Sequence, residues 1–258
     1  MGNMEALYNT WKAIGTSGGD LSFFQDFFVK FYQAFIEADR WLQYLNGVKT
    51  TLLVTALALI LGVALGVTVA ILRTAHDQQR PGHRNPVLAV LNLVCKIYVT
   101  VIRGTPMMVQ LLIMGLVIFA SNRNKTMIGA LSLGINSGAY VAEIIRGGLM
   151  SLDPGQMEAG RSLGLGYMDT MRFIVIPQAI KAILPALGNE FIILLKDTSL
   201  ITVIGGKELL HAAQGIMGRT YEAMFPLIGI ACMYLVLVMI FTWLLGKLER
   251  RLRQSDRR

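Results

Sequence analysis

The chain has 258 residues, of which 54% are hydrophobic and only 16% are charged, and its mean hydropathy is +0.54. Soluble domains carry roughly 25% charged residues, so this composition excludes an ordinary soluble domain and indicates a polytopic membrane protein. The net charge of +8 is spread over short loops and a tail rather than one folded face. It therefore argues against nucleic-acid binding and fits cytoplasmic loops enriched in Lys and Arg.

Residues 1–20 are weakly patterned, and we expect a mobile or surface segment there. In residues 21–45 aromatic side chains recur at helical spacing, which predicts an amphipathic helix in the membrane interface. A helix packed on the membrane bundle would explain the same pattern equally well. The aromatic positions are Phe24, Phe27, Phe28, Phe31, Phe35 and Trp41.

Residues 47–72 form the first predicted span. At about 1.5 Å per residue they are long enough for a hydrocarbon core of roughly 30 Å. Gly62 and Gly66 form a pair of small residues suited to close helix packing. Residues 73–84 carry three arginines, so this loop is placed in the cytoplasm and the N-terminus outside.

Residues 86–120 are predicted to form one broken element, with its first part near the cytoplasmic interface and its second part crossing outward. Arg-Gly-Thr-Pro at residues 103–106 interrupts the helix. Such breaks are tolerated in membranes where they line a cavity or are covered by protein. A simple proline kink and a direct role in a transport pathway both remain open.

Residues 127–149 are predicted to cross back to the cytoplasmic side. Their polar members recur every three or four residues and form one stripe that faces the bundle. Glu143 and Arg146 are close enough on a helix to pair near its cytoplasmic end, chiefly as a structural contact. The stripe consists of Asn136, Ser137, Tyr140, Glu143 and Arg146.

Residues 149–177 form the longest polar interruption in the apolar second half. The pattern predicts a short helix, a glycine turn, a second short helix and a proline that starts the next element. Asp153 and Pro154 suit the beginning of the first helix. Gly164 and Gly166 suit its end, because glycine adopts left-handed backbone geometry at little steric cost.

The span after Pro177 carries four polar side chains in an apolar run: Asn189, Glu190, Lys196 and Asp197. Each charge costs a few kcal/mol or more in hydrocarbon, so such residues normally face a bundle interior or a wet cavity. Glu190 and Asp197 are seven residues apart and share one helix face. A polar solute path and a structural network between helices are the two interpretations.

Residues 200–224 are semi-polar and placed outside, and residues 226–246 form the last span before a basic cytoplasmic tail. The prediction is an all-α polytopic membrane protein with five transmembrane helices. Its parts are an extracytoplasmic N-terminal segment (1–45), a transmembrane domain (46–247) with a cytoplasmic loop (151–176), and the tail (248–258).

The cytoplasmic loop resembles a known family. Glu158-Ala159-Gly160 is followed by Gly164 and, after nine intervening residues, by residues 174–177, Ile-Val-Ile-Pro. This is the spacing of the EAA signature in membrane subunits of ATP-binding-cassette (ABC) importers, with Gly160 in place of the second Ala and Ile176 in place of Leu. Residues 103–110, 137–148 and 188–200 further resemble the branch for polar amino acids (histidine, glutamine, glutamate, arginine and opines).

The resemblance covers residues 45–250 and implies a MetI-like, type I importer permease fold in a bacterial inner or plasma membrane. The loop would be a coupling helix that docks on an ATPase. The implied function is import of polar amino acids, with cationic ones mildly favoured by the two acidic positions. The implied partners are two ATPase subunits, a second permease copy or paralogue, and an external solute-binding protein.

The resemblance also assigns candidate residues. Glu190 and Asp197 would bind an α-ammonium group or a basic side chain, while Lys196, Thr198 and Ser199 are weaker candidates for a carboxylate. The other pathway candidates are Asn189, Thr105 and Gln110, and the coupling candidates are Glu158, Ala159, Gly160, Arg161 and Gly164.

Several chemistries have no support in the sequence. Gly205-Gly206-Lys207 lacks the rest of a phosphate-binding loop, so ATP hydrolysis with its Mg²⁺ is expected on a partner subunit and no cofactor or enzymatic activity on this chain. Cys95 and Cys232 lie in apolar segments, where we expect them buried, and no metal ligand set is visible.

The alternative function is a self-sufficient secondary transporter or channel that uses Glu190 and Asp197 as an ion relay. The particular amino acid, and a homodimer against a heterodimer, stay open.

Overall fold

The computed structural model describes residues 2–79 and 85–254, and this part of the chain is helical, with no strand. In chain order the elements are α1 (Gly2–Thr16), α2 (Phe23–Phe35), η1 (Glu37–Asp39), α3 (Arg40–Asp77), α4 (Pro86–Gly104), α5 (Met107–Leu112), η2 (Ile113–Ile118), α6 (Lys125–Met150), α7 (Gly155–Ser162), α8 (Tyr167–Thr170), η3 (Met171–Val175), α9 (Ile176–Asp197), η4 (Thr198–Ile204), α10 (Leu209–Thr220) and α11 (Met224–Gln254). Of the η elements, η1 and η4 are 3₁₀ turns and η2 and η3 are π-helical.

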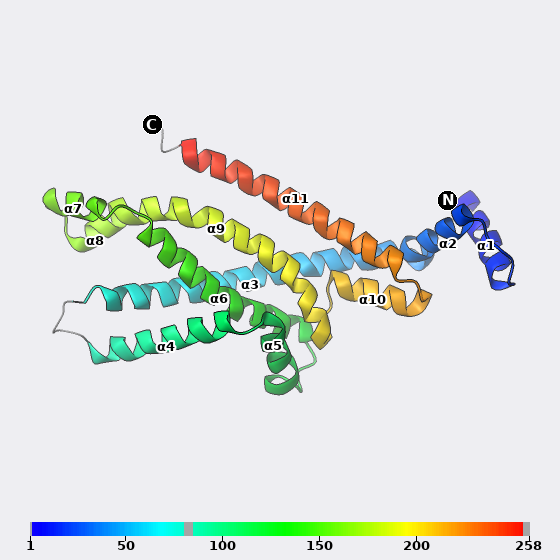
Figure 1. Cartoon of the computed structure of the whole chain (residues 1–258), viewed down its shortest axis with the longest axis horizontal. Coiled ribbons are helices and arrows are strands. Elements are labelled where there is room, and N and C mark those ends of the chain that lie inside the picture. The colour runs from blue at the N-terminus through cyan, green and yellow to red at the C-terminus, as the bar shows by residue number, and fades with distance from the viewer. Residues whose placement is uncertain (1, 80–84, 255–258) are drawn as a thin grey trace.

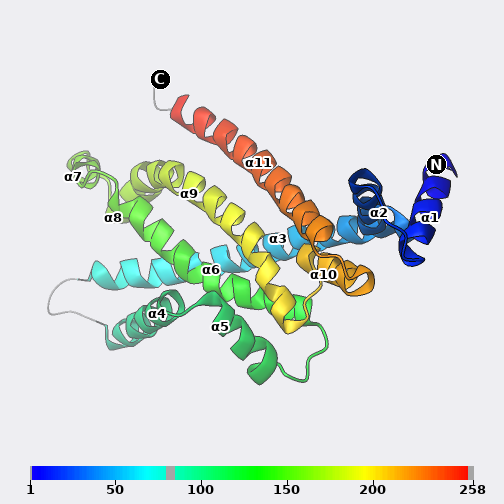
Figure 2. The same ribbon diagram turned by 45° about the vertical axis from the view of Figure 1, so that its right-hand side comes forward.

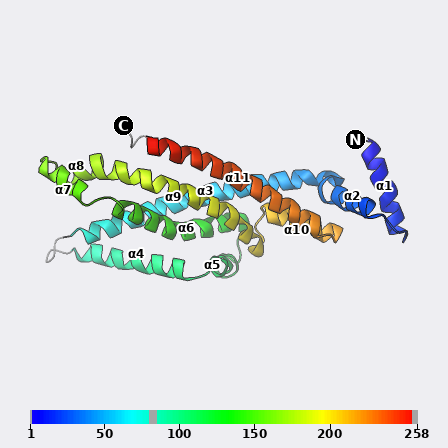
Figure 3. The same cartoon turned by 45° about the horizontal axis from the view of Figure 1, so that its top comes forward.

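Five of the described helical runs are long and apolar enough to cross a membrane, which confirms the predicted all-α, five-span class. They are Glu37–Asp77, Pro86–Gly104, Lys125–Met150, Tyr167–Ile204 and Met224–Leu252. Helices α7 and α8 lie at one end of the long molecule, the end toward which α3 and α11 run, whereas α1 and α2 lie at the other (Figures 1 and 3).

Helix α3 packs along α6, and α6 also contacts α9 (Figure 2). Glycines of α3 bring the backbones of α3 and α6 close together, as the spacing of Gly62 and Gly66 predicted. A Cβ atom on Gly66 would lie 2.5 Å from Cγ1 of Val141, and one on Gly62 would lie 2.8 Å from Oγ of Ser137. The contact therefore leaves no room for a side chain at either position.

Residues 2–16, in the segment expected to be mobile or on the surface, form the helix α1. Most of α1 is exposed, but Tyr8 is buried and stacks on Tyr32 of α2 with 4.3 Å between ring centroids. The Nζ atom of Lys12 donates to Oε1 of Glu37 at 2.6 Å. The hydrogen bond to this carboxylate raises the pKa of Lys12 above its usual range, and the nearby Tyr8 hydroxyl adds to the effect. These contacts, which join distant segments, hold α1 in place.

The aromatic helix is shorter than the sequence pattern suggested. It ends at Phe35, because the following Ala38 and Asp39 adopt left-handed backbone angles with φ of 54° and 52°. This conformation costs roughly 1–2 kcal/mol per residue for a side chain other than glycine. Trp41 consequently belongs to α3, which begins at Arg40.

The break at residues 103–106 is present, but it divides the chain differently from the expectation. Helix α4 is by itself long enough to cross, and the helical segment after the break, Met107–Ile118, is the shorter one. Asn85 caps α4 by accepting from the backbone N–H of Val87, and Pro86 occupies the first turn. Helix α5 then leaves the line of α4 (Figure 1).

The last span is longer than the apolar pattern alone indicated. Helix α11 runs from Met224 to Gln254, so the first part of the basic tail is helical, while residues 255–258 lie outside the described residues. Cys95 is buried as expected, but Cys232 is exposed on α11. Apolar sequence context predicts a membrane location, and it does not distinguish a lipid-facing position from a packed one.

We expect Gly66→Val to destabilise the chain by about 1–3 kcal/mol, because the new side chain overpacks the contact between α3 and α6. The midpoint of thermal unfolding of the purified protein in detergent measures this. Ala64→Val is the matched control, since Ala64 is exposed on the same helix. Equal midpoints for the two variants would contradict the close packing described here.

Candidate functional site

Glu190 lies inside the bundle, where α9 faces α6. Its side chain is only 6% exposed, and its Oε1 atom accepts from Oγ of Ser137 at 2.7 Å. Asp197, seven residues on, is half-buried. In the described part of the chain, Asp197 accepts no hydrogen bond and makes no ion pair. The two carboxylates of the predicted face therefore differ. Glu190 is hydrogen-bonded to α6, whereas Asp197 has no hydrogen-bond or ion-pair partner among the described residues.

The other polar groups of this span have separate surroundings. Asn189 and Lys196 are exposed. The hydroxyl of Thr198 is buried and donates to the carbonyl of Leu195 at 2.8 Å, and that of Ser199 donates to the carbonyl of Lys196 at the same distance. The hydroxyl hydrogens of Thr198 and Ser199 are thus already donated to backbone carbonyls. A role for these residues in binding a carboxylate stays a prediction.

Gln110 holds the break between α4 and α5 together. Its Nε2 atom donates to the carbonyl of Ile102 and to Oγ1 of Thr105, both at 2.7 Å. Its Oε1 atom accepts from Nδ2 of Asn136 on α6 at 3.0 Å. Backbone oxygens freed by the interruption are thereby satisfied, as a membrane interior requires.

The Gln110 network borders a cavity of about 250 Å³ between α4, α5 and α6. Thr105 and Gln110, both predicted pathway residues, lie in its wall together with Ser132. Neither Glu190 nor Asp197 lines it. Within this single chain the predicted pathway residues therefore fall into two groups, one at the helix break and one on α9.

Glu143 does not pair with Arg146, and this corrects the sequence-based expectation. Its Oε1 atom instead lies 2.7 Å from Nη1 of Arg73, and its Oε2 atom lies 3.5 Å from Nη1 of Arg103. Arg146 approaches Asp77 at 3.9 Å. Helical spacing within α6 allowed the local pair, but the arginines of α3 and α4 offer Glu143 partners on the side where these helices pack.

The predicted coupling loop has the expected order of elements. Asp153 accepts from the N–H of Gly155 at 2.8 Å at the start of α7, and Gly164 ends α7 with a left-handed φ of 82°. Gly166 begins α8 instead of ending α7. Pro177 does not start a separate element, because α8, η3 and α9 form one helical run.

Within this loop, Glu158, Ala159 and Arg161 are exposed on α7, whereas Gly160 is buried. A Cβ atom on Gly160 would lie 2.5 Å from Cγ2 of Thr170. The glycine that replaces the second alanine of the EAA pattern thus allows α7 to pack on the turn that follows.

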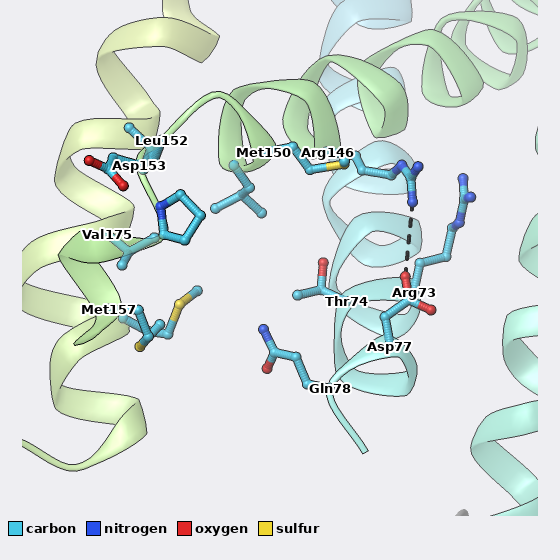
Figure 4. A pocket seen from close by; sticks show the side chains of 13 residues that line it. Arg73, Thr74, Asp77, Gln78, Arg146, Met150, Leu152, Asp153, Met157 and Val175 are labelled. Carbon is cyan, nitrogen blue, oxygen red and sulfur yellow. Dashed lines mark ion pairs between the residues drawn. The ribbon is translucent and has the colours of Figure 1, made fainter. Parts of the chain in front are cut away.

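A cavity of about 430 Å³ lies between this loop and the ends of α3 and α6 (Figure 4). Arg73, Asp77 and Arg146 line one side, and Met157 and Val175 of the loop lie opposite. The loop is therefore separated from the end of α3 by a space rather than by packed side chains.

Sequence reasoning missed a buried carboxylate at the other end of the bundle. Glu208 is 2% exposed, and it accepts from Thr202, from the N–H of His211 at 2.8 Å and from the hydroxyl of Tyr234 at 2.6 Å. It caps α10 and ties that helix to α11. Its position just before an apolar helical run is an N-cap signal, but nothing local reveals Tyr234 as its partner.

The fold is that of a polytopic helical membrane protein with a loop of two short helices at one end. Residues 87–254 match the family model described as "Binding-protein-dependent transport system inner membrane component". The chain belongs to this family.

Two curated relatives are also named as transport permeases. The putative glutamine transport system permease protein GlnP of Rickettsia bellii is 35% identical over 213 residues, covering 80% of this chain and 91% of the relative. The glutamine transport system permease protein GlnP of Escherichia coli K12 is also 35% identical, covering 81% and 92%.

Two solved structures share the fold. The crystal structure of an amino acid ABC transporter with histidines is 43% identical, with a TM-score of 0.73, and the match covers 81% of this chain and 94% of that one. An inward-facing structure of the MetNI methionine ABC transporter is 19% identical with a TM-score of 0.69, covering 84% and 99%. The second similarity supports the MetI-like fold alone.

We expect Gly160→Ala to loosen the coupling loop, because its methyl group overlaps Thr170. The variant should lose about 1–3 kcal/mol of stability and be cleaved faster by trypsin within residues 151–176. Gly147→Ala is the matched control, since a Cβ there meets no atom within 4 Å. If the two variants behave alike, the tight approach of α7 to Thr170 is not required.

Proposed function

We propose that this chain is the transmembrane permease subunit of an ATP-driven ABC importer that brings polar amino acids across the cell membrane. The observation that carries the proposal is the match over most of the chain, at 43% identity, to an amino acid ABC transporter of known structure. The names of the curated glutamine permeases point to the same substrate class. We assign no narrower substrate, because an external binding protein would set much of the selectivity.

The assembly that follows has two permease chains, two ATPase subunits on the cytoplasmic side and a solute-binding protein outside. ATP and Mg²⁺ would bind to the ATPase subunits, and this chain would need no cofactor. The distribution of charge supports the orientation, because the C-terminal parts of α3 and α11 carry arginines and lie toward the end that holds α7 (Figure 1). The N-terminus would then be outside and the C-terminus in the cytoplasm.

The coupling step would use the exposed face of α7. Glu158 and Arg161 are exposed there and available to a partner, whereas Gly160 faces the chain's own interior. Closure of the ATPase pair would move α7 and, through the continuous helix from α8 to α9, the span that carries Glu190 and Asp197. This is rigid-body alternating access.

Asp197 is the better supported of the two acidic candidates for binding an ammonium group. Its carboxylate is half-buried and has no hydrogen-bond or ion-pair partner in the described residues, whereas Glu190 is held by Ser137. An unpaired carboxylate at membrane depth is costly, and a cationic group of a passing solute would offset that cost.

Aromatic side chains of α2 support an interfacial position for this helix outside the transmembrane domain. Phe23 and Phe24 are 76% and 79% exposed, and Phe27 contacts Phe225 at the start of α11 with 4.9 Å between ring centroids. One end of the helix would thus face lipid headgroups while the other packs on the bundle.

We expect Glu158→Lys to abolish recovery of a P-loop ATPase when the tagged chain is purified from membranes, because the reversed charge lies on the docking face. Identification of co-purifying proteins by mass spectrometry measures this. Asp20→Lys makes the same charge change in an exposed loop at the opposite end and should leave recovery unchanged. A chain that purifies alone and moves solute in liposomes without ATP would overturn the importer in favour of an ion-coupled carrier.

Asp197→Asn should lower ATP-dependent uptake of labelled amino acid by the reconstituted complex about tenfold or more, because a charge-assisted hydrogen bond to the solute is lost. Recovery of the ATPase should be unaffected. Asp20→Asn is the control, with its carboxylate exposed far from the spans. Uptake by Asp197→Asn at the wild-type rate would remove Asp197 from the pathway.

A further inference from the structure

A third cavity, of about 360 Å³, lies between α3, α4 and α6 on the cytoplasmic side of the helix break. We call it the basic vestibule, and its lining residues are Arg73, Lys96, Val99, Thr100, Arg103 and Glu143. It adjoins the cavity at Thr105 and Gln110, because the two use neighbouring turns of α4. Lys96 lies about 15 Å along α4 from the cytoplasmic start of that helix.

Hydrogen-bond donors outnumber acceptors in the basic vestibule. The ammonium group of Lys96 and the hydroxyl of Thr100 make no hydrogen bond or ion pair among the described residues. The Nε atom of Arg73 is buried and also lacks a partner. Both oxygens of Glu143 already face Arg73 and Arg103. The donors therefore lack an acceptor that this chain supplies.

The charges of the lining side chains also indicate that an anionic group is missing from the cavity. Three cationic side chains and one carboxylate line the cavity, which leaves a surplus of two positive charges at membrane depth. Lys96 and Arg103 are exposed on the surface of the single chain, so their charges are open to a group from outside it. Within a membrane span such cations are costly, and they are found where a pathway or a bound anion compensates them. The missing component is an anionic group that enters from outside the chain.

We propose that the basic vestibule binds the carboxylate of the transported amino acid as it leaves toward the cytoplasm. This inference rests on the proposed importer function and adds an exit station to it. Lys96 and Thr100 donate to the carboxylate, and Arg103 contributes a second positive charge. The α-ammonium group faces Glu143, the one acidic side chain of the cavity.

Two features favour an amino acid over other anions. The volume is in the range of small-molecule sites, roughly 300–1,000 Å³. Glu143 would repel a phosphate dianion but complements a zwitterion, which carries both signs of charge. The two cavities share the C-terminal half of α4, so a solute that leaves the Gln110 cavity toward the cytoplasmic start of α4 would pass this site.

The test measures binding of radiolabelled glutamine to the nucleotide-free permease–ATPase complex in nanodiscs. Lys96→Gln should weaken binding about tenfold, because it removes a charge-assisted hydrogen bond and no other contact of the described chain. Lys96→Arg should restore most of the affinity. Lys49→Gln is the matched control, since Lys49 is an exposed lysine of α3 outside the cavity that makes no contact of its own.

Competition with 4-aminobutanamide, which is glutamine without its carboxylate, isolates the contribution of the carboxylate to binding. The analogue should compete poorly with wild type, and its affinity should be the same in Lys96→Gln. A Lys96→Gln complex that binds glutamine as wild type does, while Asp197→Asn weakens binding, overturns the vestibule and leaves the importer function intact. A wild-type complex that neither binds nor transports any amino acid overturns the importer function itself.

A lipid is the remaining occupant to exclude. Native mass spectrometry of complexes in nanodiscs with and without phosphatidylglycerol shows whether an anionic headgroup is retained. Retention that depends on Lys96 and is not reduced by glutamine would assign the cavity to lipid and overturn the proposal. Displacement of the lipid by glutamine supports it.

Discussion

The close contact between α3 and α6 positions the polar groups of the bundle. Because Gly62 and Gly66 carry no side chain, the two backbones approach until Ser137 and Val141 fill the space between them. At this separation Ser137 also reaches Glu190 on α9, and Glu143 reaches Arg73. A larger residue on α3 would move α6 and displace both carboxylates from their partners together.

Most polar groups of the spans are satisfied inside the protein, and this makes the exceptions informative. Lys125 donates from Nζ to the carbonyls of Gly115, Phe119 and Ala120, at 2.7, 3.1 and 3.0 Å, and so caps the end of η2. Asp197 and Lys96 are two opposite charges of the spans that make no ion pair with another described residue. An amino acid carries the complement of both.

The sequence alone was sufficient to predict the structural features whose physical signal is local. Length and hydropathy predicted five spans, glycine spacing predicted the contact at Gly62 and Gly66, and Gly164 predicted the turn after α7. It was insufficient where the partner is distant along the chain. Spacing paired Glu143 with Arg146, whereas three-dimensional packing paired it with Arg73. The anchoring of α1 by Tyr8 likewise depends on a residue of another helix.

The π turn η3, between the coupling loop and α9, has a consequence for the loop's orientation. A π turn closes each hydrogen-bonded ring with one residue more than an α turn. Each residue of an α-helix turns the chain by about 100°, so one residue fewer in Met171–Val175 would swing α7 to a different side of α9. The direction in which α7 faces its partner is thus set by a residue count, independently of the side chains it presents.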